Sequence, residues 1–213
     1  MIECIEQIKI KYKNLNYYDR SLLKEGNTVL VVVDMTNGFV KEGNLYSDRV
    51  EKIIDPVIEY INMFANFQKL YFLDEHKKNA KEFHAFPPHG IGKEGNLIAE
   101  LELLIDGKSV KISKNSINGF FAPEFGDWLQ INFKDINNYV IVGDCTDLCV
   151  MQFALSVKAF YNQWEIESNV IIPINAVETF DLKETFHDGE LMNLFAFYNM
   201  ELNGINIVKG ISD

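Results

Sequence analysis

Cys149 carries the thiol that is best placed in this chain for covalent chemistry. It follows an apolar run, residues 139 to 142, which breaks at Gly143, and the sequence predicts a helix start near Thr146 or Asp147. A thiol at such a strand-to-helix turn lies near free backbone N–H groups and the positive end of a helix dipole, and both favour the reactive thiolate. The alternative is a buried cysteine that only packs. Two further residues favour a nucleophile.

An aspartate and a lysine follow two other predicted strands. Asp34 comes directly after residues 28 to 33, and Lys114 directly after residues 109 to 113. Alone, the aspartate would be a turn or helix-capping residue and the lysine a solvated one. Together with Cys149 they supply an acid, a cation and a thiol. The cation lowers the thiol pKa, and the carboxylate can accept the thiol proton and return it to a leaving group. The trio therefore predicts nucleophilic catalysis.

A segment rich in histidine and acidic residues follows a further apolar run, residues 69 to 74. Asp74 and His76 point the same way if the strand continues, because side chains repeat every second residue. Two prolines would hold His89 on a stiff, extended stretch. Imidazole and carboxylate ligands suit zinc, manganese or iron(II). The segment predicts a divalent metal site; the alternative is a solvated loop whose histidines are incidental.

The neighbouring residues give weaker signals. His84 lies two residues after Glu82 and faces either the site or solvent, while His187, far along the chain, has no assigned role. Residues 90 to 96 contain three glycines, but they follow no strand and lack the spacing of phosphate-binding loops. A flexible loop beside the site is the expectation for them.

Strand and helix patterns alternate along the chain. Six runs predict strands, at residues 28–34, 69–74, 109–113, 139–142, 169–173 and 205–209. Periodic patterns predict helices at residues 48–67 with a kink at Pro56, 96–104, 124–132, 146–162 and 189–201. This alternation predicts an α/β fold, a three-layer α/β/α sandwich around a mostly parallel six-stranded sheet. Ligands bind such sheets beyond the carboxyl ends of the strands, where four candidate residues fall: Asp34, Asp74, Lys114 and Cys149.

Composition and charge narrow the class of protein. The 213 residues are 47% hydrophobic and 24% charged, which fits one globular domain, residues 28 to 213, after an N-terminal extension of residues 1 to 27. The net charge of −11 argues against nucleic acid and anionic membranes. No apolar run approaches the roughly 20 residues of a membrane span. An acidic N-terminus unlike a signal peptide, and three cysteines without a disulfide framework, predict a cytoplasmic protein.

These motifs resemble those of the isochorismatase-like cysteine hydrolases, and of nicotinamidases in particular. The resemblance covers residues 28 to 210 and rests on the aspartate after the first strand, D-x-H followed by P-P-H, the lysine after the third strand, and G-x-x-T-D-x-C-V. It implies that the catalytic triad is Asp34, Lys114 and Cys149. It also implies that the metal ligands are Asp74, His76 and His89. Some members of the family add a glutamate ligand, and Glu82 is the matching residue here.

The resemblance further implies a cis peptide between Asp144 and Cys145, and an oxyanion hole formed by the backbone N–H groups of Cys145 and Cys149. Aromatic residues wall the ring pocket of such enzymes, and the comparable positions here are Phe39, Phe86 and Phe120. Two departures bear on the substrate. The C-x-x-G-T segment common after P-P-H is replaced by Gly90-Ile-Gly-Lys, and the stretch between the two histidine motifs is short.

The expected protein is a cysteine amidohydrolase that acts on a small planar carboxamide, nicotinamide foremost, through a thioester. Its expected cofactor is a divalent metal, with zinc first and manganese or iron as alternatives, and its expected state is a homo-oligomer. Two other functions remain open: hydrolysis of another small amide or ureide, and a non-catalytic metal- or ligand-binding domain on the same scaffold. The complete triad argues against the last, because a binding protein needs no thiol nucleophile.

Overall fold

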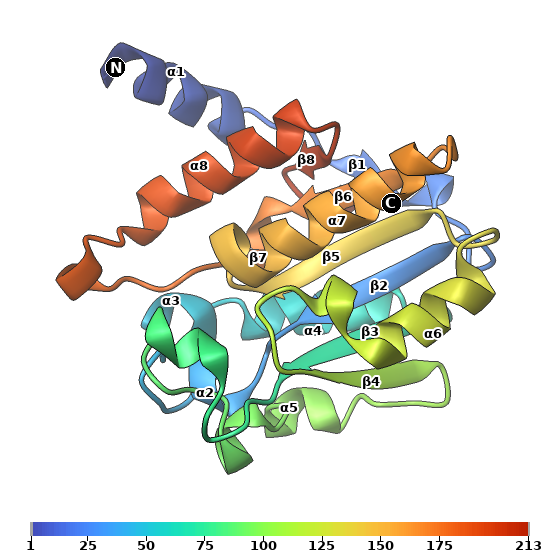
Figure 1. Ribbon diagram of the computed structural model, residues 1–213. Coiled ribbons are helices and arrows are strands. Elements are labelled where there is room, and N and C mark those ends of the chain that lie inside the picture. The colour runs from blue at the N-terminus through green and yellow to red at the C-terminus, as the bar shows by residue number, and fades with distance from the viewer. Residues whose placement is uncertain (1, 213) are drawn as a thin grey trace.

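A parallel sheet forms the centre of the computed structural model, which describes residues 2 to 212 (Figure 1). Six strands lie side by side in the order β4-β3-β2-β5-β6-β8, and every neighbouring pair is parallel. Their bounds are β2 Thr28–Val33, β3 Gln68–Asp74, β4 Ser109–Lys114, β5 Asn138–Asp144, β6 Asn169–Pro173 and β8 Asn206–Val208. A two-residue strand, β7 (Val177–Glu178), pairs with the end of β5. The predicted α/β fold is confirmed.

Alternating side chains of β2 explain why this strand occupies the middle of the sheet. All six of its residues are buried. Val29, Val31 and Val33 belong to one hydrophobic core, while Leu30 and Val32 belong to the core on the opposite face. An unbroken aliphatic run is typical of a strand covered on both faces.

Helices cover both faces of the sheet (Figure 1). The first core contains residues of α6 (Pro123–Asn132), α7 (Met151–Gln163) and α8 (Gly189–Leu202). The second core contains residues of α2 (Asn37–Val40), α3 (Asp48–Glu51), α4 (Ile54–Met63) and α5 (Ala99–Glu102). The chain is therefore a three-layer sandwich, as the alternation of elements predicts.

Two predicted helices are shorter than expected. The segment 48–67 forms α3 and α4, which are separated at Lys52 and Ile53. Pro56 explains the break, because it has no N–H to donate to the carbonyl of Lys52 and its ring crowds that carbonyl. Of the segment 96–104 only α5 is helical, since Leu97 pairs with Thr36 in an antiparallel bridge.

The N-terminal residues pack against the end of the chain. Helix α1 (Ile2–Lys13) lies beside α8, where the Tyr12 ring is 5.6 Å from that of Phe197 and its hydroxyl donates to Glu201 at 2.9 Å. Strand β1 (Tyr18–Asp19) pairs in parallel with β9 (Ile211–Ser212).

The outermost residues of the predicted extension and domain, Met1 and Asp213, lie outside the described residues. Among residues 2 to 212, no helix combines the length and the apolar character that a membrane crossing requires.

Candidate active site

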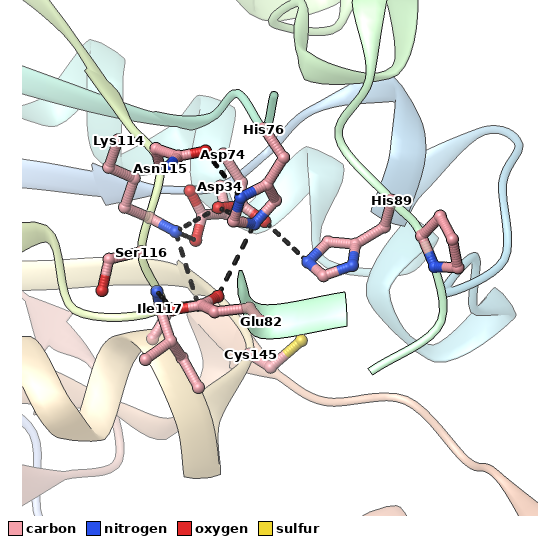
Figure 2. A network of polar contacts seen from close by, with 12 residues as sticks. Asp34, Asp74, His76, Glu82, His89, Lys114, Asn115, Ser116, Ile117 and Cys145 are labelled. Atoms are coloured by element: carbon pink, nitrogen blue, oxygen red, sulfur yellow. Dashed lines mark hydrogen bonds and ion pairs between the residues drawn. The ribbon is translucent and has the colours of Figure 1, made fainter. Parts of the chain in front are cut away.

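The carboxyl ends of three neighbouring strands bring two aspartates and a lysine together (Figure 2). Asp74 and Lys114 are direct partners in the register of β3 and β4. The Lys114 Nζ lies 2.8 Å from Asp74 Oδ1 and 2.9 Å from Asp34 Oδ2. None of the three side chains is more than 2% exposed. Parallel strands thus gather the charged residues at one edge, as predicted.

The local backbone directs Asp34 into this cluster. Asp34 has a φ of +53°, a left-handed conformation that aspartate adopts more readily than most residues. Its N–H donates to the carbonyl of Phe72 at 3.1 Å. On the neighbouring strand Gly143 has a φ of +110°, and a Cβ there would lie 2.1 Å from the Val33 carbonyl oxygen. Only glycine fits at this crossing, so β2 and β5 can end close together.

Cys149 reaches the cluster from a turn rather than from a strand. Residues Thr146–Val150 form one π-helical turn that continues into α7. The N–H groups of Leu148 and Val150 both donate to the Cys145 carbonyl at 3.1 Å. The thiol is buried, and its Sγ lies 3.7 Å from Lys114 Nζ. The peptide between Asp144 and Cys145 is cis, as the resemblance implies.

Burial sets the protonation of the three triad residues. It raises the pKa of Cys149 well above its usual value; Lys114 opposes this rise, whereas Asp34 and Asp74 add to it. The expectation of a favoured thiolate is therefore wrong for the resting site. Burial also raises the pKa of Asp34, to about 6, against the effect of Lys114. Burial disfavours the Lys114 ammonium, but the two aspartates raise its pKa well above the usual value.

At neutral pH the cluster accordingly contains a thiol, an ionised carboxylate and an ammonium group. In this state Cys149 must lose its proton during the attack itself. Asp34 is the ionised base beside it, because a pKa of about 6 leaves the carboxylate unprotonated at pH 7.

A second cluster shares Asp74 with the first. His76 Nε2 lies 3.1 Å from Asp74 Oδ1, and His89 Nε2 lies 3.1 Å from Asp74 Oδ2. One donor atom from each residue lies within 4.8 Å of the others. The remaining ring nitrogens are fixed from behind, with His76 Nδ1 at 3.3 Å from Asn115 Oδ1 and His89 Nδ1 at 2.8 Å from the Pro87 carbonyl. Such outer partners orient metal-binding imidazoles.

The donor set fits a divalent metal ion. The Nε2 atom of His76 is fully buried and has no well-aligned hydrogen bond within the described part of the chain, although Asp74 is near. A buried nitrogen of this kind needs a partner, and two imidazoles with a carboxylate are ligands that zinc, manganese or iron accept. Glu82 lies at the edge, with Oε2 3.7 Å from His76 Nε2 and Oε1 accepting from the Ile117 N–H at 2.7 Å. His84 is exposed and lies outside this group.

A small cavity opens onto both clusters. Its lining consists of Phe39, Leu45, Asp74, Glu82, Phe86, His89, Ile117, Cys145, Leu148, Cys149 and Phe180. Phe39 and Phe86 therefore lie where the resemblance places them. Phe120 does not. Its N–H donates to Asn118 Oδ1 at 3.0 Å, and its half-buried ring packs against the first hydrophobic core, 5.5 Å from Phe125 and 6.0 Å from Phe160. The structure does not support the pocket role predicted for Phe120.

The structure adds residues to the site that the sequence analysis does not predict. The cavity is also lined by Phe180, Leu45 and Leu148, and no sequence motif predicts a pocket role for these residues. Asn115, which fixes His76, could have been found, because it directly follows the lysine at the end of β4. His187 contacts Asp147, two residues before the nucleophile, at 2.9 Å.

The sheet and the clustered acid, lysine and thiol define an α/β protein with the parts needed for hydrolytic chemistry at the carboxyl end of its strands. The isochorismatase domain matches residues 28 to 200, and the chain belongs to this family. The resemblance seen in the motifs is thus confirmed.

Two relatives are similar in sequence. Nicotinamidase 1 of Arabidopsis thaliana is 27% identical over 220 residues, which span 90% of this chain and 89% of that protein. A probable inactive nicotinamidase of the same plant is 28% identical over 149 residues, which span 62% of this chain and 74% of that protein. Together with the family match, the first relative supports an enzyme that hydrolyses amide bonds.

Solved structures share the fold. A nicotinamidase from Bacillus subtilis has a TM-score of 0.70 at 22% identity, with 85% of this chain and 99% of that chain covered. A pyrazinamidase of Pyrococcus horikoshii in complex with zinc has a TM-score of 0.68 at 23% identity, with 86% and 99% covered.

Proposed function

We propose that the protein is a cysteine amidohydrolase that converts a small planar carboxamide, nicotinamide foremost, to the carboxylic acid and ammonia. One observation carries the proposal: Asp34 and Lys114 lie beside Cys149, and Cys149 lines a cavity with aromatic walls. Since one relative bears the description of a probable inactive nicotinamidase, family membership alone does not establish activity. The complete and converging triad supports an active enzyme.

The reaction begins with the thiol of Cys149. Asp34 accepts the thiol proton as the sulfur adds to the amide carbon. Lys114 stays positively charged, so it stabilises the developing thiolate and holds both aspartates in place. The backbone N–H groups of Cys145 and Cys149 receive the oxyanion of the tetrahedral intermediate, where one such donor is worth about 3 kcal/mol.

Proton return completes each half of the reaction. Asp34 gives its proton to the amide nitrogen, the C–N bond breaks, and ammonia leaves behind a thioester on Cys149. Asp34 then takes a proton from a water molecule as the water oxygen adds to the thioester carbon. The C–S bond breaks, the acid departs, and the proton returns to the sulfur. A carboxyl pKa of about 6 suits this double role.

The second cluster would hold the metal. Asp74, His76 and His89 are the proposed ligands, with Glu82 beside them, and zinc is the first candidate because a zinc-bound relative shares the fold; manganese and iron suit the same ligands. When bound, the metal supplies a Lewis acid that anchors a ring nitrogen of the substrate or polarises a water.

A hydrolase of another small amide or ureide is the second candidate. The fold also matches an N-carbamoylsarcosine amidase from Thermoplasma acidophilum, with a TM-score of 0.67 at 21% identity. The aromatic lining favours a flat ring, because Phe39, Phe86 and Phe180 offer faces and edges rather than polar groups.

The remaining expectations belong to the same proposal. A cytoplasmic location is supported by three free cysteines. A net charge of −11 supports a small-molecule partner rather than nucleic acid or an anionic membrane. The homo-oligomeric state stays a prediction.

Ammonia release from a panel of amides tests the function. The panel contains nicotinamide, pyrazinamide, benzamide and an N-carbamoyl amino acid, and the enzyme is supplied with zinc, manganese or iron in turn. We expect the pyridine and pyrazine amides to be cleaved fastest. Fastest cleavage of the carbamoyl compound would favour the second candidate, and no release from any compound with any metal would contradict an amidohydrolase.

A further inference from the structure

A polar link joins the π-helical turn Thr146–Val150, which we call the nucleophile turn, to the segment between β7 and α8. We call residues 179–188 the strap. His187, near the end of the strap, has its Nε2 2.9 Å from Asp147 Oδ2. Asp147 is buried and lies in the same π-helical turn as Cys149. The nucleophile turn and the strap are far apart in sequence, so the link fixes two separate segments relative to one another.

The same histidine holds an aromatic wall of the cavity. Phe180, at the start of the strap, lines the cavity together with Cys149 and is 4% exposed. The rings of Phe180 and His187 are stacked, with centroids 4.2 Å apart and planes 14° from parallel. The His187 Nδ1 also lies 2.9 Å from the Phe180 carbonyl oxygen. His187 therefore contacts both the ring and the backbone of this wall residue.

Backbone bonds give the strap a defined shape. Leu182 and His187 exchange two hydrogen bonds, of 2.9 and 3.0 Å. The N–H of Gly189, the first residue of α8, donates to Asp181 Oδ1 at 2.7 Å. The strap is thus a closed loop, and the His187 side chain connects it to the nucleophile turn.

Hydrogen-bond chemistry shows what this link requires. The Phe180 carbonyl and the Asp147 carboxylate are both acceptors, so each of the two contacts of His187 needs a proton. The ring and the Asp147 carboxyl must therefore hold two protons between them. An asparagine at position 147 would offer N–H groups instead, and a ring with a single N–H would then complete both contacts. Asp147→Asn can therefore preserve the link, whereas Asp147→Ala removes it.

We propose that His187 is a positioning residue that, through Asp147, sets the distance between the Phe180 wall and the Cys149 nucleophile. The wall then selects flat substrates and excludes bulkier ones. This inference rests on the proposed function for the identity of the substrate, but the shape of the cavity can be tested without turnover.

The first measurement is steady-state kinetics on the amide that the wild-type enzyme cleaves fastest. We expect His187→Ala to raise KM about tenfold, the size of effect that one lost pocket contact produces, while kcat changes little. Phe180→Ala should do the same, and the double variant should be no worse than Phe180→Ala alone. Asp147→Ala should match His187→Ala, and Asp147→Asn should restore KM toward the wild-type value.

The second measurement is alkylation of Cys149, read by mass spectrometry of its own peptide. Iodoacetamide is compared with its bulkier, non-planar N-tert-butyl derivative. The wild-type cavity should discriminate strongly against the tert-butyl reagent, and His187→Ala and Asp147→Ala should both lose most of that discrimination. Phe186→Ala is the matched control, because this neighbouring ring is 90% exposed and should leave both readouts unchanged.

The outcomes separate the two proposals. If the wild type releases no ammonia from any amide, the proposed function fails, and the alkylation ratio still decides the role of His187. Additive effects of His187→Ala and Phe180→Ala, an unchanged alkylation ratio, or a change in Phe186→Ala equal to that in His187→Ala would each overturn the positioning role. Should His187→Ala not fold by circular dichroism, Asp147→Ala against Asp147→Asn makes the same comparison.

Discussion

Two buried lysines lie at opposite ends of neighbouring strands, and they are satisfied in different ways. Lys69, near the start of β3, and Lys114, at the end of β4, both have side chains that are 1% exposed. The Lys69 Nζ donates to the carbonyls of Ala65 and Phe67, at 3.1 and 3.2 Å, and lies 2.9 Å from Asp106, whose side chain is 43% exposed.

Lys114 has reactive partners instead. Its neighbours are the buried carboxylates of Asp34 and Asp74 and the thiol of Cys149. Backbone carbonyls do not exchange protons, and burial of Asp106 is outweighed by its hydrogen bonds with Lys69 and Ser109, which lower the pKa of this carboxyl, so it stays ionised at neutral pH. Lys69 therefore closes a structural contact. Around Lys114, by contrast, two acids and a thiol share one cation, and a proton can move between them. The difference shows that a buried charge supports chemistry where its partners can exchange protons near neutral pH, and supports structure where they cannot.

The largest expected effect breaks the chemistry at the Lys114 end. Cys149→Ala should lower kcat by about 10⁴-fold or more, because the nucleophile is lost. The fold should remain, since removing one buried sulfur costs no more than about 1 kcal/mol. Ammonia release and thermal unfolding measure the two effects. Cys4→Ala is the matched control, because Cys4 is exposed on α1; turnover retained by Cys149→Ala would exclude covalent catalysis.

The lysine pair itself provides the next test. Lys114→Met should lower kcat/KM by about 10²–10³-fold, the effect of losing one group that stabilises transition-state charge. It should also slow alkylation of Cys149 at neutral pH, since Lys114 opposes the rise in the pKa of this thiol. Lys69→Met should leave kcat unchanged and lower the free energy of unfolding by about 1–3 kcal/mol, because two carbonyls lose their donor. Equal alkylation rates for Lys114→Met and the wild type would remove Lys114 from the triad.

Metal removal tests the second cluster, which Lys114 joins through Asp74. We expect chelation and His89→Ala each to raise KM for nicotinamide by about 10–100-fold, a range typical of damaged metal sites. His84→Ala is the matched histidine control, because its side chain is exposed and lies outside the ligand group. Bound metal is measured in the same samples by mass spectrometry. Identical kinetics with and without metal would contradict an anchoring role.

The sequence predicts the strands and the residues at their ends well, for a local reason. Runs such as residues 28 to 33 are β-branched and unbroken, and a parallel sheet places whatever follows each run at one edge. That rule brings together Asp34, Asp74 and Lys114 before any coordinates are known. The glycine that lets β2 and β5 converge, Gly143, was visible only as the end of an apolar run.

Features that depend on contacts between distant segments could not be predicted. Phe120 lies near the site in sequence, yet its ring packs toward α6 and α7. Phe180 and His187 reach the site from the strap, which has no motif. The protonation of Cys149 was wrongly predicted, because its turn suggests a thiolate but burial, which the sequence does not show, outweighs the nearby cation.

The pH profile gives the smallest expected effect, and it reports directly on the ionisation of the Lys114 cluster. Burial raises the pKa of Asp34 to about 6, and the carboxylate must be ionised to accept the thiol proton. We therefore expect kcat/KM to fall tenfold per pH unit below about pH 6 and to level above it, with an apparent pKa that belongs to the coupled cluster.

The same shift has a consequence for stability, with a defined sign. The folded pKa of Asp34 lies above its ordinary value of 3.8, so its contribution is fully present below about pH 4 and is lost as pH rises through about 6. The unfolding free energy of the wild type minus that of Asp34→Asn should therefore fall from about pH 4 to pH 7, as urea titrations at the two pH values can show. Lys69→Met should leave this pH dependence intact, because Lys69 lies at the opposite end of the sheet. A rise with pH in the unfolding free energy of the wild type relative to that of Asp34→Asn would mean that Asp34 is ionised well below pH 6, with Lys114 rather than burial controlling its charge.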